Sequence, residues 1–293
     1  MKTLQLLISN VRNDYLEEAS EGKWTNDEIA RRISEKAQQL GIVLAGFDEG
    51  WFDYYHDFSV TASTTYYDLP PNVQQIIDCQ IPGTTTYGRT GVITARNRPI
   101  YALSTSLRRE YTYPQGVSLV WRLHGNQIEF LPAVTSTTTV RMFYTRKLPK
   151  LHYGTAQINV LTGQIILASS ATAGEIGTGD DYYNGAWVYI AATDELREIT
   201  DYAAGTKIAT VGTAFGSAPS SSTVYTIMCE LPDEWMPLVE MGAAIRLLSK
   251  SGESEVRSLL VEDYNTLYAS LVSGSQRRQI QEFHTINPAE AEP

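Results

Sequence analysis

The sequence predicts an α+β protein. Two N-terminal and two C-terminal helices form a discontinuous helical bundle that carries antiparallel β insertions and an extended C-terminal tail. Apolar residues recur with helical spacing at both ends of the 293-residue chain and with a period of two between them. The composition, 43% hydrophobic and 19% charged, is that of a folded chain and not of a disordered one. No apolar run approaches the roughly 18–20 residues that a membrane-spanning helix needs, and we expect no leader peptide.

The first helix is predicted to begin at residue 4, with Thr3 as its N-cap. Its apolar residues follow the spacing of a single helix face, so they can pack together against a partner. They are Leu4, Leu7, Ile8, Val11 and Tyr15.

The second helix begins with a capping box, TNDE at residues 25–28, in which the Thr and Glu side chains satisfy each other's free backbone N–H groups. Trp24 and Ile29 stand at the two positions of a hydrophobic staple. Gly41 is expected to end the helix. The apolar stripe consists of Ile29, Ile33, Ala37 and Leu40.

Residues 51–154 are predicted to form an antiparallel sheet with long loops, because the apolar period changes to two. Pro70 and Pro71 interrupt this pattern, since neither a helix nor a central strand tolerates them. Gly125-Asn126 predicts a two-residue hairpin with glycine first, as a type II′ turn requires. The alternating apolar residues are Phe58, Val60, Tyr66, Leu69, Leu119, Trp121, Leu123, Ile128, Phe130, Val140, Met142 and Tyr144.

Residues 155–228 are expected to form a small inserted β barrel or sandwich domain, in which small residues dominate. Residues 160–165 predict a tight hairpin, and Asn184-Gly185 predicts a turn at the end of a loop. The predicted strands are residues 186–191, 196–200, 206–211 and 223–228.

Two more helices are predicted near the C-terminus. Asp233 is expected to cap the first of them, with Pro237 in its first turn and Gly252 at its end. Gly274 is expected to end the second, and the polar residues 275–293 to remain an extended tail. The two stripes contain Leu238, Met241, Ile245 and Leu248, then Val256, Leu260, Tyr264, Leu267 and Leu271.

Each helix pair leaves an apolar stripe that requires a partner. We therefore expect residues 1–50 and 229–274 to form one helical core, although about two hundred residues separate them. The segments 51–154 and 155–228 would then be insertions into this core.

Charge is unevenly distributed along the chain. The whole protein has 33 acidic and 23 basic residues, a net charge of −10. Residues 79–174 contain ten basic and two acidic residues, which is +8, so the remainder carries −18. This segregation suits an assembly protein that meets complementary surfaces, and it equally fits a sheet that is solvated by arginine. The two cysteines, Cys79 and Cys229, favour a reduced, cytosolic chain.

The sequence contains no phosphate-binding loop, no nucleophile elbow and no zinc-protease motif, the motifs that would indicate common enzymatic reactions. We assign no catalytic residue, no cofactor and no metal ligand. A pair of carboxylates for glycoside hydrolysis is an alternative that the sequence does not exclude, because the distance between them is set by the three-dimensional structure. Asp180, Asp181 and Asn184 lack the spacing of a calcium loop and are interpreted as turn residues.

Two further groups of residues could either bind a ligand or simply belong to exposed loops and turns. His56 stands between Asp53 and Asp57, which could contact a cation, but an exposed loop cluster is favoured. The run GTG at residues 177–179 is interpreted as a turn and not as a phosphate-binding motif, because it does not lie between a strand and a helix.

Basic and aromatic residues also occur together in the middle of the chain. Such a composition can bind phosphate and stack bases. The net charge of −10 and the lack of a recognition helix oppose this, so we expect no tight DNA binding and favour pairing with an acidic neighbouring subunit. The residues are Arg96, Arg98, Arg108 and Arg109, near Tyr101, Tyr111 and Tyr113.

The order of several short motifs resembles the head-to-tail adaptor, or tail accessory, proteins of short-tailed bacteriophages. The motifs are KWTNDEI at 23–29, YYDLPPNV at 66–73, YPQG at 113–116, IEFLP at 128–132, MFYTRKLP at 142–149 and LPDEW at 231–235. They span nearly the whole chain except residues 155–228, an extra β segment in which YYNG at 182–185 and REITDY at 197–202 resemble a small module of phage virion proteins.

The resemblance implies a structural virion protein with no enzymatic activity, located at the head–tail junction after synthesis in the host cytoplasm. Such adaptors bind the portal protein as a ring, commonly of twelve, extend the DNA channel and dock tail components such as nozzle, tube or fibre proteins. Genomic DNA would pass through the channel without specific binding, and no membrane is involved. The expected interface with the portal or a neighbouring subunit comprises Arg277, Arg278, Ile280, Phe283 and Ile286.

A different function stays open beside this one. The β insertions and tyrosine-rich loops also suit sugars, which would make the protein a host-surface glycan-binding tail protein or a cell-wall hydrolase. On this alternative, the segment 155–228 would bind cell-wall or surface polysaccharide.

Overall fold

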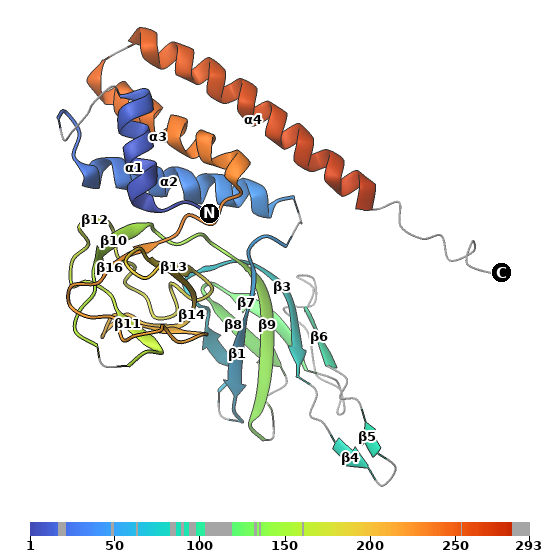
Figure 1. Cartoon of the computed structure of the whole chain (residues 1–293). Helices are drawn as coiled ribbons and strands as arrows, with labels where there is room; N and C mark the ends of the chain where they lie inside the picture. Colours follow the sequence, from blue (N-terminus) through green and yellow to red (C-terminus); the bar gives the residue numbers. More distant parts are fainter. Residues whose placement is uncertain are drawn as a thin grey trace. The chain divides into compact units, whose positions relative to one another are not determined.

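The predicted α+β class is confirmed by a computed structural model, in which four α-helices accompany predominantly antiparallel sheets within the described residues (Figure 1). The described residues are 1–16, 22–47, 50–62, 64–82, 86–88, 91–93, 98–102, 119–131, 134, 136–159, 161–252 and 254–282.

The chain divides into two compact units. The first unit combines Met1–Trp51 with Lys147–Pro293, and the second is Phe52–Arg146. This division differs from the expected one in two respects. Residues 147–154 belong with the helices, and the segment 155–228 shares a unit with the helices instead of standing alone.

All four described α-helices lie in the first unit. Thr3 caps the first helix as predicted, because its hydroxyl accepts a hydrogen bond from the backbone N–H of Leu6 at 3.3 Å. A π-helical turn, Val11–Tyr15, continues this helix, and a 3₁₀ turn, Asp233–Trp235, precedes the third. The helices are α1 (Leu4–Asn10), α2 (Asn26–Ala45), α3 (Met236–Ser251) and α4 (Ser254–Glu282).

Helix α2 begins as predicted but ends later. The Thr25 hydroxyl accepts a hydrogen bond from Glu28 N at 3.2 Å, while the Glu28 carboxylate binds Lys250 of α3. The prediction that Gly41 ends the helix is wrong, because α2 continues to Ala45. A Cβ atom at Gly41 would lie 2.8 Å from Cδ1 of Leu148, so this glycine permits close packing and does not terminate the helix.

The start of α3 also differs from the prediction. Asp233 does not cap the helix: it begins the 3₁₀ turn, and its carboxylate accepts a hydrogen bond from the Met1 ammonium group at 3.0 Å. Pro237 lies in the first turn of α3, as expected. Gly252 ends the helix with a left-handed conformation, φ +79°, which confirms its predicted role.

Helices from the two ends of the sequence contact one another within the first unit. Helix α2 packs against both α1 and α3. The Lys2 ammonium group lies 3.2 Å from the buried carboxylate of Glu240 on α3, so charge pairing accompanies apolar contact. Buried side chains of these three helices include Leu7, Ile29, Ile33, Leu40, Leu238, Val239 and Leu247.

A seven-stranded sheet in the order β11-β15-β14-β13-β16-β10-β12 completes the first unit. The four predicted strands are confirmed as β13 to β16. β11 pairs with β15, and across the predicted hairpin at 160–165 Gln157 N donates to the Ile166 carbonyl at 2.9 Å; residue 160 lies outside the described residues. The strands are β10 (His152–Thr155), β11 (Gln164–Ile166), β12 (Ala173–Gly174), β13 (Trp187–Ile190), β14 (Glu195–Ala203), β15 (Ile208–Val211) and β16 (Val224–Ile227).

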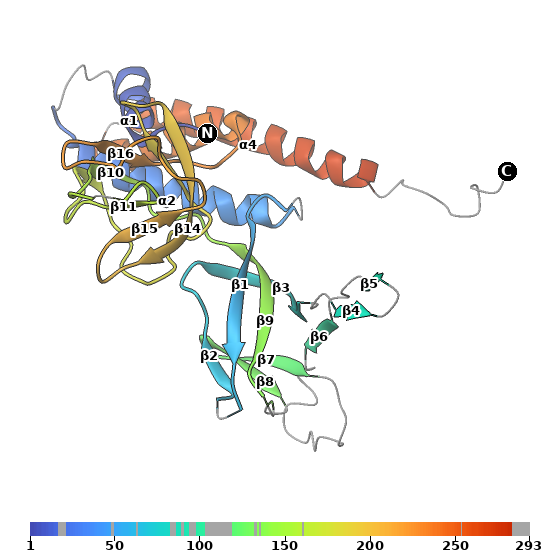
Figure 2. The same cartoon turned by 60° about the horizontal axis from the view of Figure 1, so that its bottom comes forward.

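The sheet and the helices of the first unit are in direct contact (Figure 2). Helix α2 contacts β12, and α1 contacts β10 and β16. Ser34 Oγ accepts a hydrogen bond from Leu151 N at 2.9 Å, and Gln38 Nε2 donates to the Leu148 carbonyl at 3.0 Å. These long-range bonds join α2 to the chain that enters β10.

The second unit contains another seven-stranded sheet, in the order β1-β9-β3-β6-β7-β8-β2. Gly125 adopts φ +63° in the predicted hairpin between β7 and β8. The sheet is mixed and not wholly antiparallel, because β6 pairs with β7 in parallel. The strands are β1 (Asp53–Val60), β2 (Tyr66–Asp68), β3 (Val73–Ile81), β6 (Arg98–Ala102), β7 (Val120–His124), β8 (Gln127–Leu131) and β9 (Thr138–Arg146), with β4 (Thr86–Gly88) paired to β5 (Gly91–Ile93) as a separate hairpin.

Alternate residues of these strands form the core of the second unit. Val140, Met142 and Tyr144 of β9 are buried, as their alternation predicts. The Tyr144 hydroxyl donates to Asn72 Oδ1 at 3.0 Å, so this large buried side chain keeps a polar partner. The other buried members are Phe58, Val60, Cys79, Ile100, Ile128 and Phe130.

The C-terminal helix is longer than predicted. Helix α4 runs through Gly274 to Glu282, so neither the predicted end at Gly274 nor the predicted start of the tail at residue 275 is correct. A helical glycine costs only about 1 kcal/mol relative to alanine, and the Gln, Arg and Glu residues that follow favour helix. Residues 283–293 lie outside the described residues.

Candidate interaction surface

Helix α4 is the element that carries most of the predicted interface, and its apolar face is incompletely covered. Leu260, Tyr264, Leu267 and Leu271 share one face, as the sequence predicts, but each is only half-buried. Two nearby residues are more open: Val256 is 49% exposed and Leu259 is 65% exposed. Among residues 255–274, whose side chains are described, none is buried. The helix therefore presents apolar surface that the described part of the chain leaves in contact with solvent.

Lys36 of α2 holds the middle of α4. Its ammonium group lies 4.4 Å from the centroid of the Tyr264 ring, a cation–π contact between helices distant in the sequence. Its aliphatic stem crosses α3 at Gly242, where a Cβ atom would lie 2.5 Å from Lys36 Cε. Gly242 thus leaves space for this side chain to reach α4. Burial, and secondarily the charge of Arg246, lowers the pKa of Lys36.

Aromatic contacts hold the next turn of α4. Tyr264 and Tyr268 stack with ring centroids 6.1 Å apart, and Tyr268 meets the buried ring of Trp235 edge-on at 6.4 Å. Phe47 contacts the same tryptophan at 6.4 Å. Such pairs contribute about 0.5–1.5 kcal/mol each beyond area burial, so a few specific contacts attach α4 to the body. We call the surface formed by Lys36, Gly242 and Trp235 the α4 seat.

The predicted interface residues fall beyond this seat. Arg277, Arg278 and Ile280 belong to the last turns of α4. Phe283 and Ile286 lie outside the described residues. The structure thus brings three of the five onto the helix whose apolar face is open. Lys36 and Gly242 were not predicted, because no local pattern distinguishes a lysine stem that packs against another helix.

A buried histidine between two tyrosines is a second feature that the sequence did not predict. His152 Nε2 lies 3.1 Å from the Tyr225 hydroxyl, and its Nδ1 lies 3.2 Å from the Tyr183 hydroxyl. The hydroxyls also accept hydrogen bonds from the backbone N–H groups of Ala168, at 2.9 Å, and Gly177, at 2.7 Å. Burial lowers the pKa of His152 to about 3. Since all three side chains are buried, this cluster fixes two loops and offers no access to a substrate.

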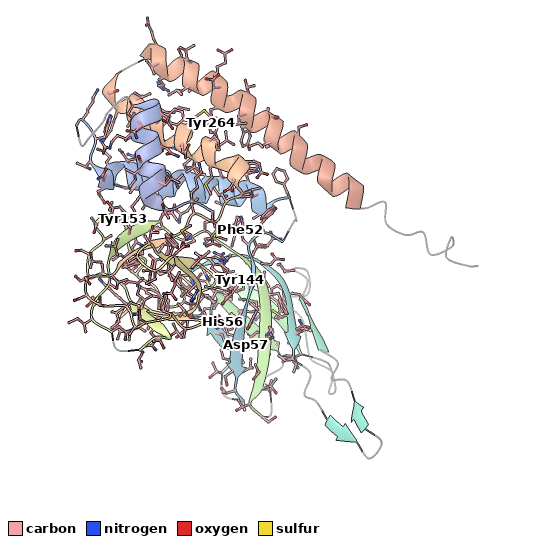
Figure 3. All side chains as sticks on the ribbon, viewed as in Figure 1. Phe52, His56, Asp57, Tyr144, Tyr153 and Tyr264 are labelled. Atoms are coloured by element: carbon pink, nitrogen blue, oxygen red, sulfur yellow. The ribbon has the colours of Figure 1, made fainter. Side chains whose placement is uncertain are left out.

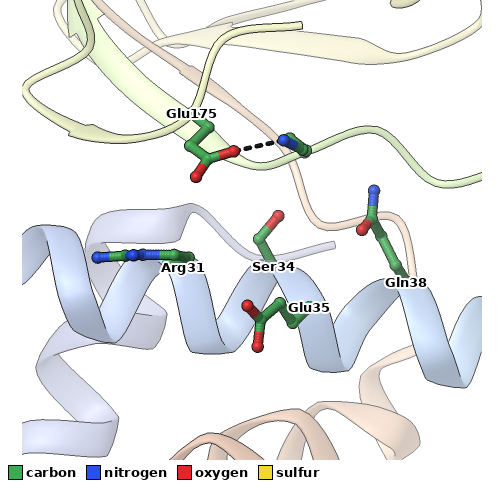
Figure 4. A pocket seen from close by; sticks show the side chains of 6 residues that line it. Arg31, Ser34, Glu35, Gln38 and Glu175 are labelled. Atoms are coloured by element: carbon green, nitrogen blue, oxygen red, sulfur yellow. Dashed lines mark hydrogen bonds and ion pairs between the residues drawn. The ribbon is translucent and has the colours of Figure 1, made fainter.

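A small polar cavity lies where α2 meets the segment around Lys150 (Figure 4). Its volume is about 90 Å³, space for water or a small ion. The Lys150 ammonium group pairs with the Glu175 carboxylate, which lowers the pKa of Glu175. The remaining lining residues are Arg31, Ser34, Glu35 and Gln38.

An open hollow of about 330 Å³ lies on the β side of the first unit. Hydroxyl groups and the stem of Lys207 line it, and the Lys207 ammonium group donates to the Ser169 carbonyl. Gly177 belongs to the predicted turn 177–179, which the structure places in a loop as expected. The lining residues are Ser169, Ser170, Ala171, Ile176, Gly177, Thr178, Ala204 and Lys207.

The acidic cluster near this hollow has the turn chemistry that the sequence predicts. Asp180 Oδ1 accepts from Ala204 N at 2.7 Å, and Asp181 Oδ1 accepts from Asn184 Nδ2 at 2.8 Å. Burial, together with Asp181, raises the pKa of Asp201. Within the described ranges, no group of three His, Cys, Asp or Glu residues is placed to hold a metal ion.

In the second unit, β1 and β9 present an aromatic and charged surface. Tyr55 is 46% exposed, and the Arg141 guanidinium lies 4.2 Å from its ring centroid. Arg141 also binds both carboxylate oxygens of Asp57 at 2.7 Å. His56 and Asp57 lie in β1 and not in a loop, which corrects the predicted loop cluster (Figure 3). Because neighbouring strand residues point to opposite faces, His56 does not share a face with Asp57.

The predicted basic and aromatic cluster cannot be assigned to a surface. Arg96, Arg108, Arg109, Tyr111 and Tyr113 lie outside the described residues. The backbone of Arg98 and Tyr101 belongs to β6. In the part of the chain that the structure describes, no helix has both the length and the apolar character to cross a membrane.

Comparison with known proteins gives no assignment. No family model matches the chain, and no curated protein matches it.

Proposed function

We propose that the protein is a head-to-tail adaptor of a short-tailed bacteriophage, a structural virion protein that binds the portal protein as a ring, with twelve copies expected. It extends the DNA channel and docks tail components. The proposal combines the motif order of the sequence with the open apolar face of α4. Within residues 255–274 of this helix the apolar side chains are incompletely covered, and Val256 and Leu259 are largely exposed, which suits contact with a further protein surface.

The position of the predicted interface residues supports the same function. The backbone of α4 continues beyond the seat that holds Tyr264 through Arg277, Arg278 and Ile280, two basic residues and one apolar residue of the sequence. Aromatic, apolar and arginine side chains are typical of the central contacts in protein interfaces. The portal and a neighbouring copy are the two partners that an adaptor ring provides.

The decisive experiment mixes the purified full chain with purified portal protein and measures assembly by sedimentation and cryo-electron microscopy. We expect a symmetric ring of the protein on the portal, around the channel. Leu259→Glu places a charge on the exposed side of α4, beside Val256, and should reduce ring formation at least tenfold if that side meets the partner, since an unpaired charge in an apolar interface is costly. Removing residues 275–293 should also weaken assembly.

A matched control uses another exposed leucine. Leu161→Glu changes a residue that is 53% exposed in a loop of the β part, so it should leave assembly unchanged. A full chain that stays separate from the portal in both measurements would exclude the adaptor function. If both leucine variants reduced ring formation equally, the exposed side of α4 would not be the surface that drives assembly.

The alternative function, glycan binding or cell-wall hydrolysis, is supported by the polar hollow near Lys207. Because residues 155–228 share a compact unit with the helices, the test uses the full chain. Binding or turnover of surface polysaccharide, reduced by Ser170→Trp within the hollow, would favour this alternative.

A further inference from the structure

The connection between α3 and α4 contains a glycine that can adopt two conformations. Helix α3 ends at Ser251 and α4 begins at Ser254, so residues 252 and 253 alone connect them. Gly252 has φ +79° and ψ +11°, the left-handed region, and a Cβ atom at this position would meet no atom within 4 Å. Glycine enters the left-handed and right-handed regions about equally well. A change of Gly252 to right-handed geometry would remove the left-handed break at the end of α3, so that α4 could extend away from α3 instead of packing along it.

The attachment of α4 to its own seat is small compared with the packing of the other helices. Ten residues of α3 are buried, whereas no described side chain of α4 between 255 and 274 is buried. Helix α4 packs along α3, and its specific side-chain contacts include Tyr264 against Lys36 and Tyr268 against Trp235. Elements with few buried contacts open locally while the rest of a protein stays folded.

We infer that α4 is exchanged between copies: it leaves its own seat and binds the same seat on a neighbouring copy. The seat is shaped for this helix, because Gly242 leaves room for the Lys36 stem and Lys36 faces Tyr264. A second copy supplies an identical α4 and is therefore the occupant that the seat fits. The inference rests on the proposed ring and names the partner of α4 within it.

Geometry permits this exchange. In a continuous helix each residue rises about 1.5 Å, so Tyr264, twelve residues beyond Gly252, would stand about 18 Å from the hinge. Because α4 would then extend away from α3 instead of packing along it, Tyr264 would leave its own Lys36. Each copy donates one helix and offers one seat, which is a head-to-tail contact of the kind that closes into rings.

The hinge can be tested with two matched glycine substitutions. Gly252→Ala penalises the left-handed conformation without a steric clash and favours a continuous helix. Gly274→Ala is the control, because it changes a glycine within α4 that also has open space around it. The penalty for a left-handed alanine corresponds to a roughly five- to thirtyfold increase in the ratio of exchanged to closed molecules.

Exchange is detected by cross-linking the full chain. Equal amounts of Lys36→Cys chains and Tyr264→Cys chains are mixed and treated with a short bis-maleimide, which links them between molecules only when α4 is exchanged. The native Cys79 and Cys229 are buried, so they should react little with the bis-maleimide and should contribute few unwanted cross-links. We expect the interchain product to rise at least fivefold with Gly252→Ala and to stay unchanged with Gly274→Ala. In a double variant, Lys36→Cys with Tyr264→Cys, an intrachain cross-link forms when α4 occupies the seat of its own chain, which is the closed form.

The same double variant, without unmodified chains, is then examined in the portal-bound ring. Interchain links there would support exchange. Rings that contain only intrachain links would overturn the inference and leave the adaptor function intact. Interchain links in free protein that never forms rings would support exchange while contradicting the adaptor function. An equal product from the two glycine variants would also overturn the inference.

Discussion

Gly41 and Leu148 approach each other so closely that a Cβ atom on the glycine would lie 2.8 Å from the leucine Cδ1. The glycine stands within α2, and the leucine stands in the chain that enters β10. Helix α2 and the segment that precedes β10 therefore meet at a position where only hydrogen fits. This contact explains why α2 passes through a glycine that local sequence rules treat as a helix end.

Gly41→Ala should destabilise the protein by about 1–3 kcal/mol, because the overpacking cost exceeds the gain in helix propensity. Gly274→Ala, in an open part of α4, should be neutral or stabilising by up to about 1 kcal/mol. Urea unfolding followed by circular dichroism measures both variants. A stabilised Gly41→Ala protein would contradict the close contact with Leu148.

Two glycines with positive φ should respond very differently to alanine. Gly174 has φ +88°, and a Cβ atom there would collide with the Leu151 carbonyl and lie 2.9 Å from His152 Cα. Gly125 has φ +63° and open space around it. We expect Gly174→Ala to cost about 4 kcal/mol or more and Gly125→Ala about 1 kcal/mol. Thermal unfolding measures the difference, and similar losses would show that backbone contact at Gly174 is unimportant.

The buried His152 should make the protein sensitive to acid. Burial lowers the pKa of His152 to about 3, whereas an exposed histidine titrates near 6.5. The unfolded chain binds a proton below about pH 6.5 and the folded chain does not, so this stability is complete above pH 6.5 and is lost progressively toward pH 3. The loss amounts to about 1.4 kcal/mol per pH unit across that window.

His152→Gln should remove this component of the pH dependence, as measured by urea unfolding at pH 7, 5.5 and 4.5. His124→Gln, at an exposed position in the second unit, should retain it. If the slope between pH 6.5 and 4.5 were identical in the two variants, His152 would not be the group responsible.

The cation–π contact between Lys36 and Tyr264 should be measurable by a double-mutant cycle. Lys36→Met keeps the length of the stem, and Tyr264→Leu keeps an apolar side chain on α4. We expect a coupling free energy of about 0.5–2 kcal/mol, appropriate to a half-buried pair. Lys36→Arg is the control and should keep most of the coupling, because it retains the positive charge. A coupling near zero would show that α4 is held by other contacts.

Much of the local structure could be predicted because its causes lie within a few residues. Thr3 and Thr25 each accept a hydrogen bond from a backbone N–H three residues later, so the start of each helix is visible in the sequence. Gly252 ends α3 through its own left-handed conformation. The alternation in β9 predicted which of its side chains are buried, since strand residues point alternately to opposite faces.

The candidate site was predicted only in part. The apolar stripe of α4 follows from helical spacing, and Arg277, Arg278 and Ile280 fall on that helix. The seat could not be predicted, because Lys36, Gly242 and Trp235 come from segments about two hundred residues apart. Similarly, nothing near His152 in the sequence indicates that Tyr183 and Tyr225 will satisfy its ring nitrogens.

By itself, the sequence determined the α+β class, the helix starts and the period of the strands, because hydrogen bonds and side-chain spacing within one turn or strand decide them. Only the tertiary structure decided the roles of Gly41 and Gly242, the full length of α4 and the grouping of β10 to β16 with the helices. These features depend on which distant surfaces meet, and the free energy of such contacts exceeds the small local preferences of glycine and polar residues.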